Sequence, residues 1–190
     1  MSNNDGITDE IRKREEEYFR RKDRELLDRM REAANAAAAR QSMENATGIH
    51  DPEQIEELQA LGFTPETLSL LPLVPVLQVA WAEGGVSTAE RTMIVDLARA
   101  REISPGSAAD VQLQEWLDQK PAEATFRKAA RLIGAMLDQP AGAEMQFNAD
   151  DLLKYCEQIA HASGGLFGIG KVSAEEKSAL QQIAAQLKAR

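Results

Sequence analysis

Two acidic side chains border a glycine turn in the middle of the chain and are its best candidates for binding a cation. Glu83 precedes Gly84-Gly85, and Glu90 follows Ser87 by three residues. A carboxylate at the C-terminal end of a helix opposes the helix dipole, so a cation beside Glu83 would relieve that conflict. Ser87 and Glu90 also fit a capping box, in which each side chain accepts a bond from the other residue's amide. The residues therefore leave two interpretations open, a divalent-cation site at Glu83 and Glu90 or plain helix capping with surface charge.

Three other patterns offer weaker chemistry. Gly165–Lys171 has the G-x-x-x-x-G-K spacing of a phosphate loop, but Val172 stands where Ser or Thr would bind magnesium. Glu157 and His161 are one helical turn apart, yet their places in the repeat described below predict a packed face rather than a metal site. Cys156 lies on a different helical face from His161 and has no positioned base. We therefore expect no catalytic residue and no enzymatic activity.

The residues that must position these side chains indicate helices throughout. Asp51-Pro52 and Thr64-Pro65 each place a capping side chain before a proline, which predicts a helix over about 52–61 and a second start near 65. Helix start and stop signals predict the remaining helices at about 73–82, 88–101, 106–119, 121–138, 149–162 and 174–188. None of the connections resembles a strand. The expected fold class is all-α.

A diverged internal repeat links the two ends of this helical region. The segment Ala80–Arg91 is echoed from Ala160 onward, with Leu166–Lys171 inserted after the second Gly-Gly pair. Both copies continue as Val-Ser and then as an amphipathic helix, and each contains the capping-box spacing Ser-x-x-Glu: Ser87 with Glu90, and Ser173 with Glu176. Each copy predicts a helical hairpin with one apolar face. We expect the two related hairpins to pack together in a helical bundle.

The first 47 residues have a different character and are expected to form a long N-terminal helix. Residues 9–32 hold nine acidic and nine basic side chains, so the net charge of −9 lies outside this segment. Opposite charges recur four residues apart, as in Glu16 and Arg20, which supports a helix. A narrow apolar stripe suits a protein partner or self-association through this helix: it consists of Phe19, Leu26, Met30, Ala33 and Ala37. We divide the chain into a charged helical arm, 1–47, and a helical bundle, 48–190; the alternative is a solvated helix lying along its own body.

Composition excludes several classes of protein. The chain of 190 residues has 22 Lys and Arg against 31 Asp and Glu, and this acidic balance disfavours a nucleic-acid partner. The single Cys156 cannot form an internal disulfide, and the N-terminal residues show no signal-peptide pattern. The longest apolar stretch, Leu68–Ala82, is interrupted by Pro72 and Pro75, so no transmembrane segment is expected. We expect a soluble cytoplasmic protein.

The glycine turn and the repeat carry a family resemblance. Residues from about 70 to 189 resemble the TerB-like tellurite-resistance family, whose signature is Ala-Asp-Gly, a variable residue, Val or Ile, and then an acidic residue opening the next helix. The matching positions are Ala82, Glu83, Gly84, Val86 and Glu90. Glu83 stands where the family usually has Asp, and Ser163 occupies the equivalent position in the second half. The resemblance implies a bundle of two related halves with a cation site at Glu83 and Glu90, and it does not extend to the arm.

The repeat and the resemblance together favour a non-enzymatic adaptor. Such a protein would bind a divalent cation or a protein partner, and the family would associate it with stress response. The alternative is a structural or oligomerisation protein that uses its N-terminal helix and binds no ligand. The two differ in what the arm and the acidic turn do, and these are the features to locate in the structure.

Overall fold

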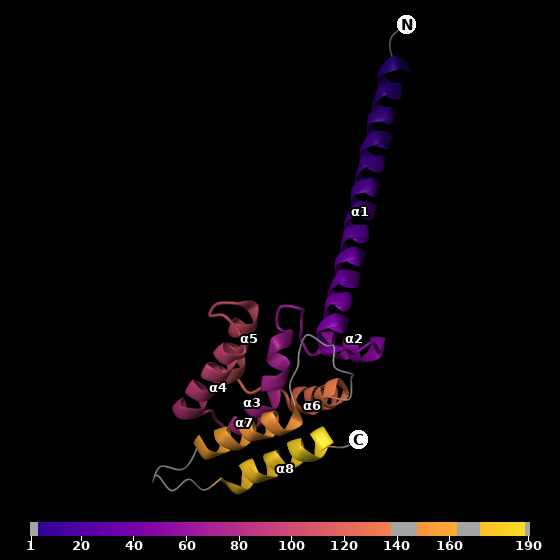
Figure 1. Cartoon of the computed structure of the whole chain (residues 1–190). Helices are drawn as coiled ribbons and strands as arrows, with labels where there is room; N and C mark the ends of the chain where they lie inside the picture. The colour runs from indigo at the N-terminus through magenta and orange to yellow at the C-terminus, as the bar shows by residue number, and fades with distance from the viewer. Residues whose placement is uncertain (1–3, 138–147, 163–171, 189–190) are drawn as a thin grey trace. The chain divides into compact units, whose positions relative to one another are not determined.

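The described part of the chain is helical and contains no strand, which confirms the all-α prediction. The computed structural model describes residues 4–137, 148–162 and 172–188. Its helices appear in Figure 1: α1 (Asn4–Thr47), α2 (Pro52–Ala60), α3 (Val74–Ala80), α4 (Thr88–Ala100), α5 (Ala108–Asp118), α6 (Glu123–Leu137), α7 (Ala149–Ala162) and α8 (Ala174–Lys188), with the 3-10 helix η1 (Leu68–Leu73) before α3. Within these ranges, no helix combines the length and the apolar character needed to cross a membrane.

The chain divides into two compact units, which we call the arm (residues 1–41) and the body (residues 42–190). The division falls inside α1, earlier than the boundary at 47 expected from sequence. Met43 and Thr47 explain this difference, because both are fully buried in the body. The Thr47 hydroxyl donates to the carbonyl of Met43 at 2.7 Å and accepts from the amide of Ile49 at 3.2 Å. The last turn of α1 is therefore part of the body's core.

Helix α3 is the centre of the body. Almost all of its side chains are buried, and it contacts α6, α7 and α8. Its most extensive contact is with α7, and α7 packs in turn on α8 and α4. The two hairpins of the repeat, α3–α4 and α7–α8, thus pack together as predicted. Pro72 lies in η1 and Pro75 in the first turn of α3, where a missing amide does not interrupt an α-helical hydrogen-bond ladder.

Capping side chains decide where most of these helices begin. The Asp51 carboxylate accepts from the amide of Glu53 at 3.0 Å and starts α2 at Pro52, as predicted. Helix α5 begins at Ala108 rather than near 106, because Ser107 is its N-cap and Gly106 has a left-handed φ of 76°. The prediction of a helix that starts near Pro65 is wrong.

A turn replaces that predicted helix. The Thr67 hydroxyl oxygen accepts from the amide of Thr64 at 2.9 Å, and the chain then continues as η1. Four of the side chains of η1 and the ring of Pro72 are buried in the core. Burial of this apolar run in the core therefore outweighs the local helix-start signal at Thr64-Pro65.

Candidate functional site

The acidic turn between α3 and α4 holds both residues predicted to bind a cation, but in different environments. Glu83 is exposed in the turn, whereas Glu90 is 2% exposed in the first turn of α4. Gly84 allows the reversal between the helices, because its φ of 86° is a left-handed conformation that other residues rarely adopt. The turn therefore presents one solvated carboxylate and shields the other.

The Glu90 carboxylate is engaged in a capping box. Its Oε2 accepts from the amide of Ser87 at 2.7 Å, and the Ser87 hydroxyl oxygen accepts from the amide of Glu90 at 3.3 Å. These bonds satisfy two amides at the start of α4, and they confirm the capping interpretation of this pair. One carboxylate oxygen of Glu90 is thus committed to holding the helix start.

The second copy of the repeat builds the same arrangement at the start of α8. Glu176 Oε2 accepts from the amide of Ser173 at 2.7 Å, and the Ser173 hydroxyl oxygen accepts from the amide of Glu176 at 3.1 Å. Glu176 is 1% exposed, so the body encloses both capping-box carboxylates. The other residues of the second turn, including Ser163 and the insertion Leu166–Lys171 with its phosphate-loop spacing, lie outside the described residues.

Packing of the two hairpins places these carboxylates within each other's electrostatic reach. Burial raises the pKa of Glu90, and the negative charges of Glu176 and Glu83 raise it further, while the hydrogen bonds from Ser87 act in the opposite direction. The sequence did not indicate that Glu176 lies near Glu90, although the two residues occupy equivalent positions in the repeat. The acidic turn is therefore a region where negative charge is concentrated and partly desolvated.

The ligand count limits what this turn can hold. Within residues 4–137, 148–162 and 172–188, no group of three or more His, Cys, Asp or Glu side chains is arranged to hold a metal ion. Calcium takes six to eight oxygen ligands and magnesium six. A cation between Glu83 and Glu90 would take its remaining ligands from backbone carbonyls and water.

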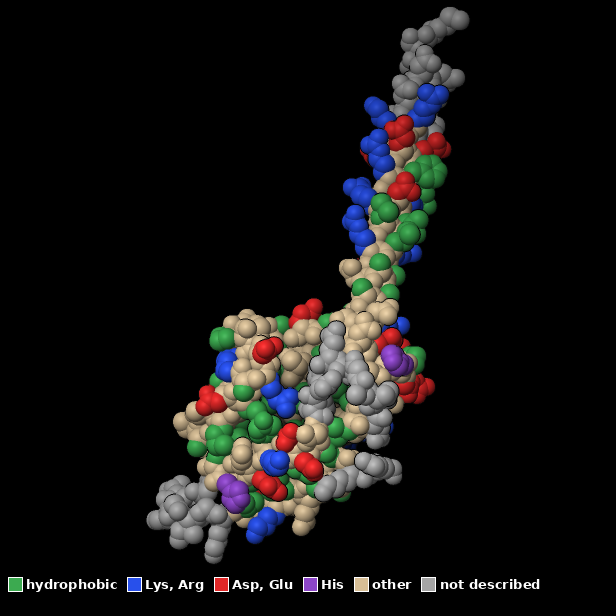
Figure 2. Space-filling model, in the orientation of Figure 1, with side chains coloured by type: hydrophobic (Ala, Val, Ile, Leu, Met, Phe, Trp, Pro, Cys, Tyr) green, Lys and Arg blue, Asp and Glu red, His purple; other side chains and the backbone are tan. Residues whose placement is uncertain are grey.

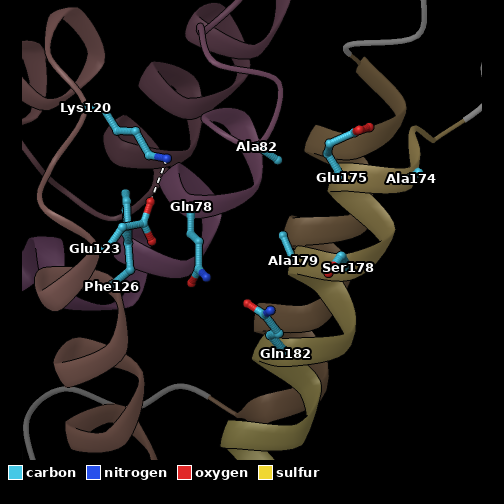
Figure 3. A pocket seen from close by; sticks show the side chains of 10 residues that line it. All are labelled: Gln78, Ala82, Lys120, Glu123, Phe126, Ala174, Glu175, Ser178, Ala179 and Gln182. Atoms are coloured by element: carbon cyan, nitrogen blue, oxygen red, sulfur yellow. Dashed lines mark ion pairs between the residues drawn. The ribbon is translucent and has the colours of Figure 1, made fainter.

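A cavity of about 380 Å³ opens beside this region, between α3, α6 and α8. Figure 3 shows Gln78 of α3 and Gln182 of α8 on facing walls, with the ion pair of Lys120 Nζ and Glu123 Oε1, 2.7 Å long, at one side. The Oε1 of Gln78 is buried and has no hydrogen-bond partner among the described residues. Two amides and an ion pair suit ordered water or a small polar molecule.

The remaining chemistry-bearing residues of α7 do not form a site. Cys156 is fully buried, and burial with the nearby charge of Glu157 raises the pKa of its thiol to about 12, which keeps the sulfur protonated and unreactive. The prediction that Glu157 and His161 lie on a packed face is wrong, because both are exposed. Their counterparts in the repeat differ: Leu77 is buried, and Trp81 is partly buried with its Nε1–H donating to the carbonyl of Trp116 at 2.8 Å.

The arm carries a second candidate site, the line of apolar side chains that we call the arm stripe (Phe19, Leu26, Met30, Ala33 and Ala37). Its large members are well exposed in this chain: Phe19 by 62%, Leu26 by 56% and Met30 by 61%. Figure 2 shows hydrophobic side chains and basic side chains along different edges of the arm. Ion pairs within the helix flank the stripe, such as Lys22 with Glu25 at 3.0 Å.

Comparison of this chain with protein-family models, with curated proteins and with solved structures found no match. The TerB-like resemblance therefore rests on the residues quoted for it above. The acidic turn and the arm stripe are the two candidate functional features of the chain.

Proposed function

We propose that this chain is a non-enzymatic helical adaptor whose arm binds a helix and whose body is a folded platform attached to that arm. The observation that carries the proposal is the arm stripe. Burying a Phe, Leu or Met side chain contributes about 1.5–3 kcal/mol, and the stripe leaves three of them mostly exposed at helical spacing. Exposed apolar residues in a continuous line are typical of interaction surfaces.

A helix fits this surface better than a flat partner. From Leu26 to Ala37 the stripe residues are three and four positions apart, and Phe19 lies seven positions before Leu26, so they follow one narrow line along α1. Apolar residues at this spacing interlock with those of a second helix, while the charged residues on either side remain in water. The body has its own core, which includes residues of α3, α6, α7 and α8, and no stripe residue belongs to that core.

Site-specific photo-crosslinking in cells that produce the protein tests the adaptor proposal. A photoreactive amino acid in place of Met30 should give a discrete adduct, because that position is in the stripe. The same amino acid in place of Asp28 is the matched control, because Asp28 is equally part of the arm but lies off the stripe. Equal labelling from both positions, or no adduct from Met30, would contradict a helix-binding stripe.

The acidic turn supports a second candidate function, the cation-responsive role implied by the TerB-like resemblance. The specific observation is that the charges of Glu83 and Glu176 act against ionisation of Glu90, so a cation bound there would remove an existing repulsion. Binding would raise the free energy of unfolding by RT ln(1 + [L]/Kd), and the melting temperature would rise with it.

Thermal melts with millimolar calcium or magnesium test this candidate. The parent chain should be stabilised by the ion, and Glu83→Gln should lose most of that response while keeping the shape of the turn. Glu115→Gln, which changes an exposed carboxylate on α5, is the control for charge alone. A parent chain that melts at the same temperature with and without both ions excludes the cation role.

A further inference from the structure

A second copy of the same arm matches the arm stripe in shape and in charge. We propose that two arms pair antiparallel, in the register that sets Leu26 of one copy against Met30 of the other. This inference rests on the proposed function, because it names the helix that the arm binds.

The spacing of the stripe fits a two-helix seam. With Asp23 included, the seam positions from Phe19 to Ala37 alternate between steps of four and three residues, as the a and d positions of a heptad do. Asp23 is the one charged residue within this run of seam positions, and it is exposed. The run covers nearly three heptads of a continuous helix that extends beyond it in both directions.

Side-chain size decides the direction of pairing. The three large residues of the stripe come first along the chain, and the two alanines follow them. In the proposed register, Phe19 faces Ala37 of the second copy and Asp23 faces Ala33, so the aromatic and the charged residue each meet an alanine. The two central residues, Leu26 and Met30, face each other. A parallel, in-register pair would set Phe19 against Phe19 and Ala33 against Ala33, which fills the seam unevenly.

Charge supports the same direction. One step beyond Phe19, the antiparallel register sets Glu16 against Arg40 of the second copy, and the symmetry of the pair makes this contact twice. Both side chains are exposed, and Glu16 contacts Arg20 of its own helix only at 3.6 Å. A parallel pair would instead oppose Glu16 with Glu16, Asp23 with Asp23 and Arg40 with Arg40, three layers of like charge.

The arm also has the charge expected for pairing with itself. Asp5 and Arg40 are its charged residues outside the balanced segment 9–32, so residues 1–41 are neutral overall. Two neutral arms approach without net repulsion. A membrane surface is a poorer match, because interfacial helices carry mainly Lys and Arg on their polar face, whereas residues 9–32 of this helix hold as many acidic as basic side chains.

A charge swap in the full chain tests the register, with mass measured by sedimentation equilibrium. The parent should dimerise, and Glu16→Arg or Arg40→Glu alone should weaken the dimer about tenfold, since each places like charges together twice. The double variant E16R/R40E should restore the parent affinity, because the pair is then reversed. Glu17→Arg and Arg31→Glu, off the stripe, are controls for helix charge and should leave the dimer unchanged.

Disulfide formation tests direction independently. A mixture of Leu26→Cys and Met30→Cys chains should form the mixed disulfide in preference to either self-pair, and buried Cys156 should not compete. Preferential self-pairing, a double variant that is not rescued, or a parent chain that remains monomeric would overturn the antiparallel pair. If the chain is monomeric but the probe at Met30 still crosslinks to a different protein in cells, only the pairing of two arms is refuted. If the chain is monomeric and the probe gives no adduct, the adaptor function is refuted as well.

Discussion

Replacing Glu90 by Gln should stabilise the body at neutral pH, although it alters a buried capping residue. Gln has nearly the same shape as Glu, and its side-chain oxygen can accept the amide of Ser87 that now lies 2.7 Å from Oε2. The pKa of Glu90 is raised, chiefly by burial and further by Glu176 and Glu83. A raised pKa means that the fold favours the neutral form of this side chain, which Gln imitates.

The expected effect follows from two opposing contributions. Removing the charge relieves the cost that the raised pKa represents, which is about 1.4 kcal/mol for each unit of pKa. Replacing the charge-assisted hydrogen bond by a neutral one lowers the stability by about 1 kcal/mol or less. We expect a net gain in stability for Glu90→Gln, and each 1 kcal/mol of gain would raise the Tm by about 2–4 °C for a domain of this size.

Glu90→Ala provides the contrast. It leaves the amide of Ser87 without its acceptor and should lower the stability by about 1–2 kcal/mol. Urea unfolding of the parent, Glu90→Gln and Glu90→Ala at pH 7 measures all three. Equal destabilisation by Gln and Ala would refute the reasoning, because it would mean that the fold needs the charge itself.

The pH dependence has a definite sign. Because the folded pKa lies above the unfolded value, near 4.5, the cost of the charge is fully present above the folded pKa. As the pH falls through the folded pKa toward 4.5, the folded protein takes up the proton first and this cost disappears. The stability gap between Glu90→Gln and the parent should therefore be largest near pH 7 and shrink toward pH 4.5; a constant gap would contradict this mechanism.

Three further outcomes are expected. Deleting residues 1–41 should leave a body that unfolds cooperatively in urea, whereas deleting 1–47 removes buried Met43 and should cost about 2–5 kcal/mol more. The thiol of Cys156, with its pKa raised to about 12 by burial, should react with Ellman's reagent only when urea unfolds the chain, and rapid reaction of the native protein would contradict its burial. Asp110→Asn should lower the Tm at pH 7, because Asp110 accepts from the amide of Gly106 at 2.8 Å and from Arg99 at 2.7 Å. These bonds lower the pKa of Asp110, so its contribution is present above the unfolded value near 3.8 and is lost as the pH falls through the lower folded value; melts of parent and variant should converge there.

Local chemistry explains which parts of the fold could be predicted from sequence. Helices α4 and α8 begin where their capping boxes indicate, since those bonds join residues only three positions apart. The start predicted at Thr64-Pro65 was wrong, because burial of the following apolar run favours η1. The arm ends earlier than predicted because Met43 is buried by residues distant in sequence, which no local pattern reports.

For the acidic turn too, the sequence predicted the local hydrogen bonds but not the contacts between distant segments. The capping roles of Glu90 and Glu176 were visible as Ser-x-x-Glu spacings, but their burial and mutual repulsion arise only when the two hairpins pack. The repeat also gave a wrong prediction for the burial of His161, which is exposed although its counterpart Trp81 is partly buried. Equivalent positions in a diverged repeat share local geometry, whereas their surroundings depend on which helices cover them.

The division of charge between the two units determines how association should respond to ionic strength. The arm is neutral overall, so the net charge of −9 belongs to the body. Added salt screens the repulsion between two bodies over a Debye length of about 10 Å at 0.1 M, and it also weakens the two exposed Glu16–Arg40 contacts of the proposed pair. The apolar contacts of the seam are insensitive to this screening. Complexes held mainly by opposite charges dissociate in concentrated salt, whereas the apolar seam should keep a pair of these chains associated as sodium chloride is added.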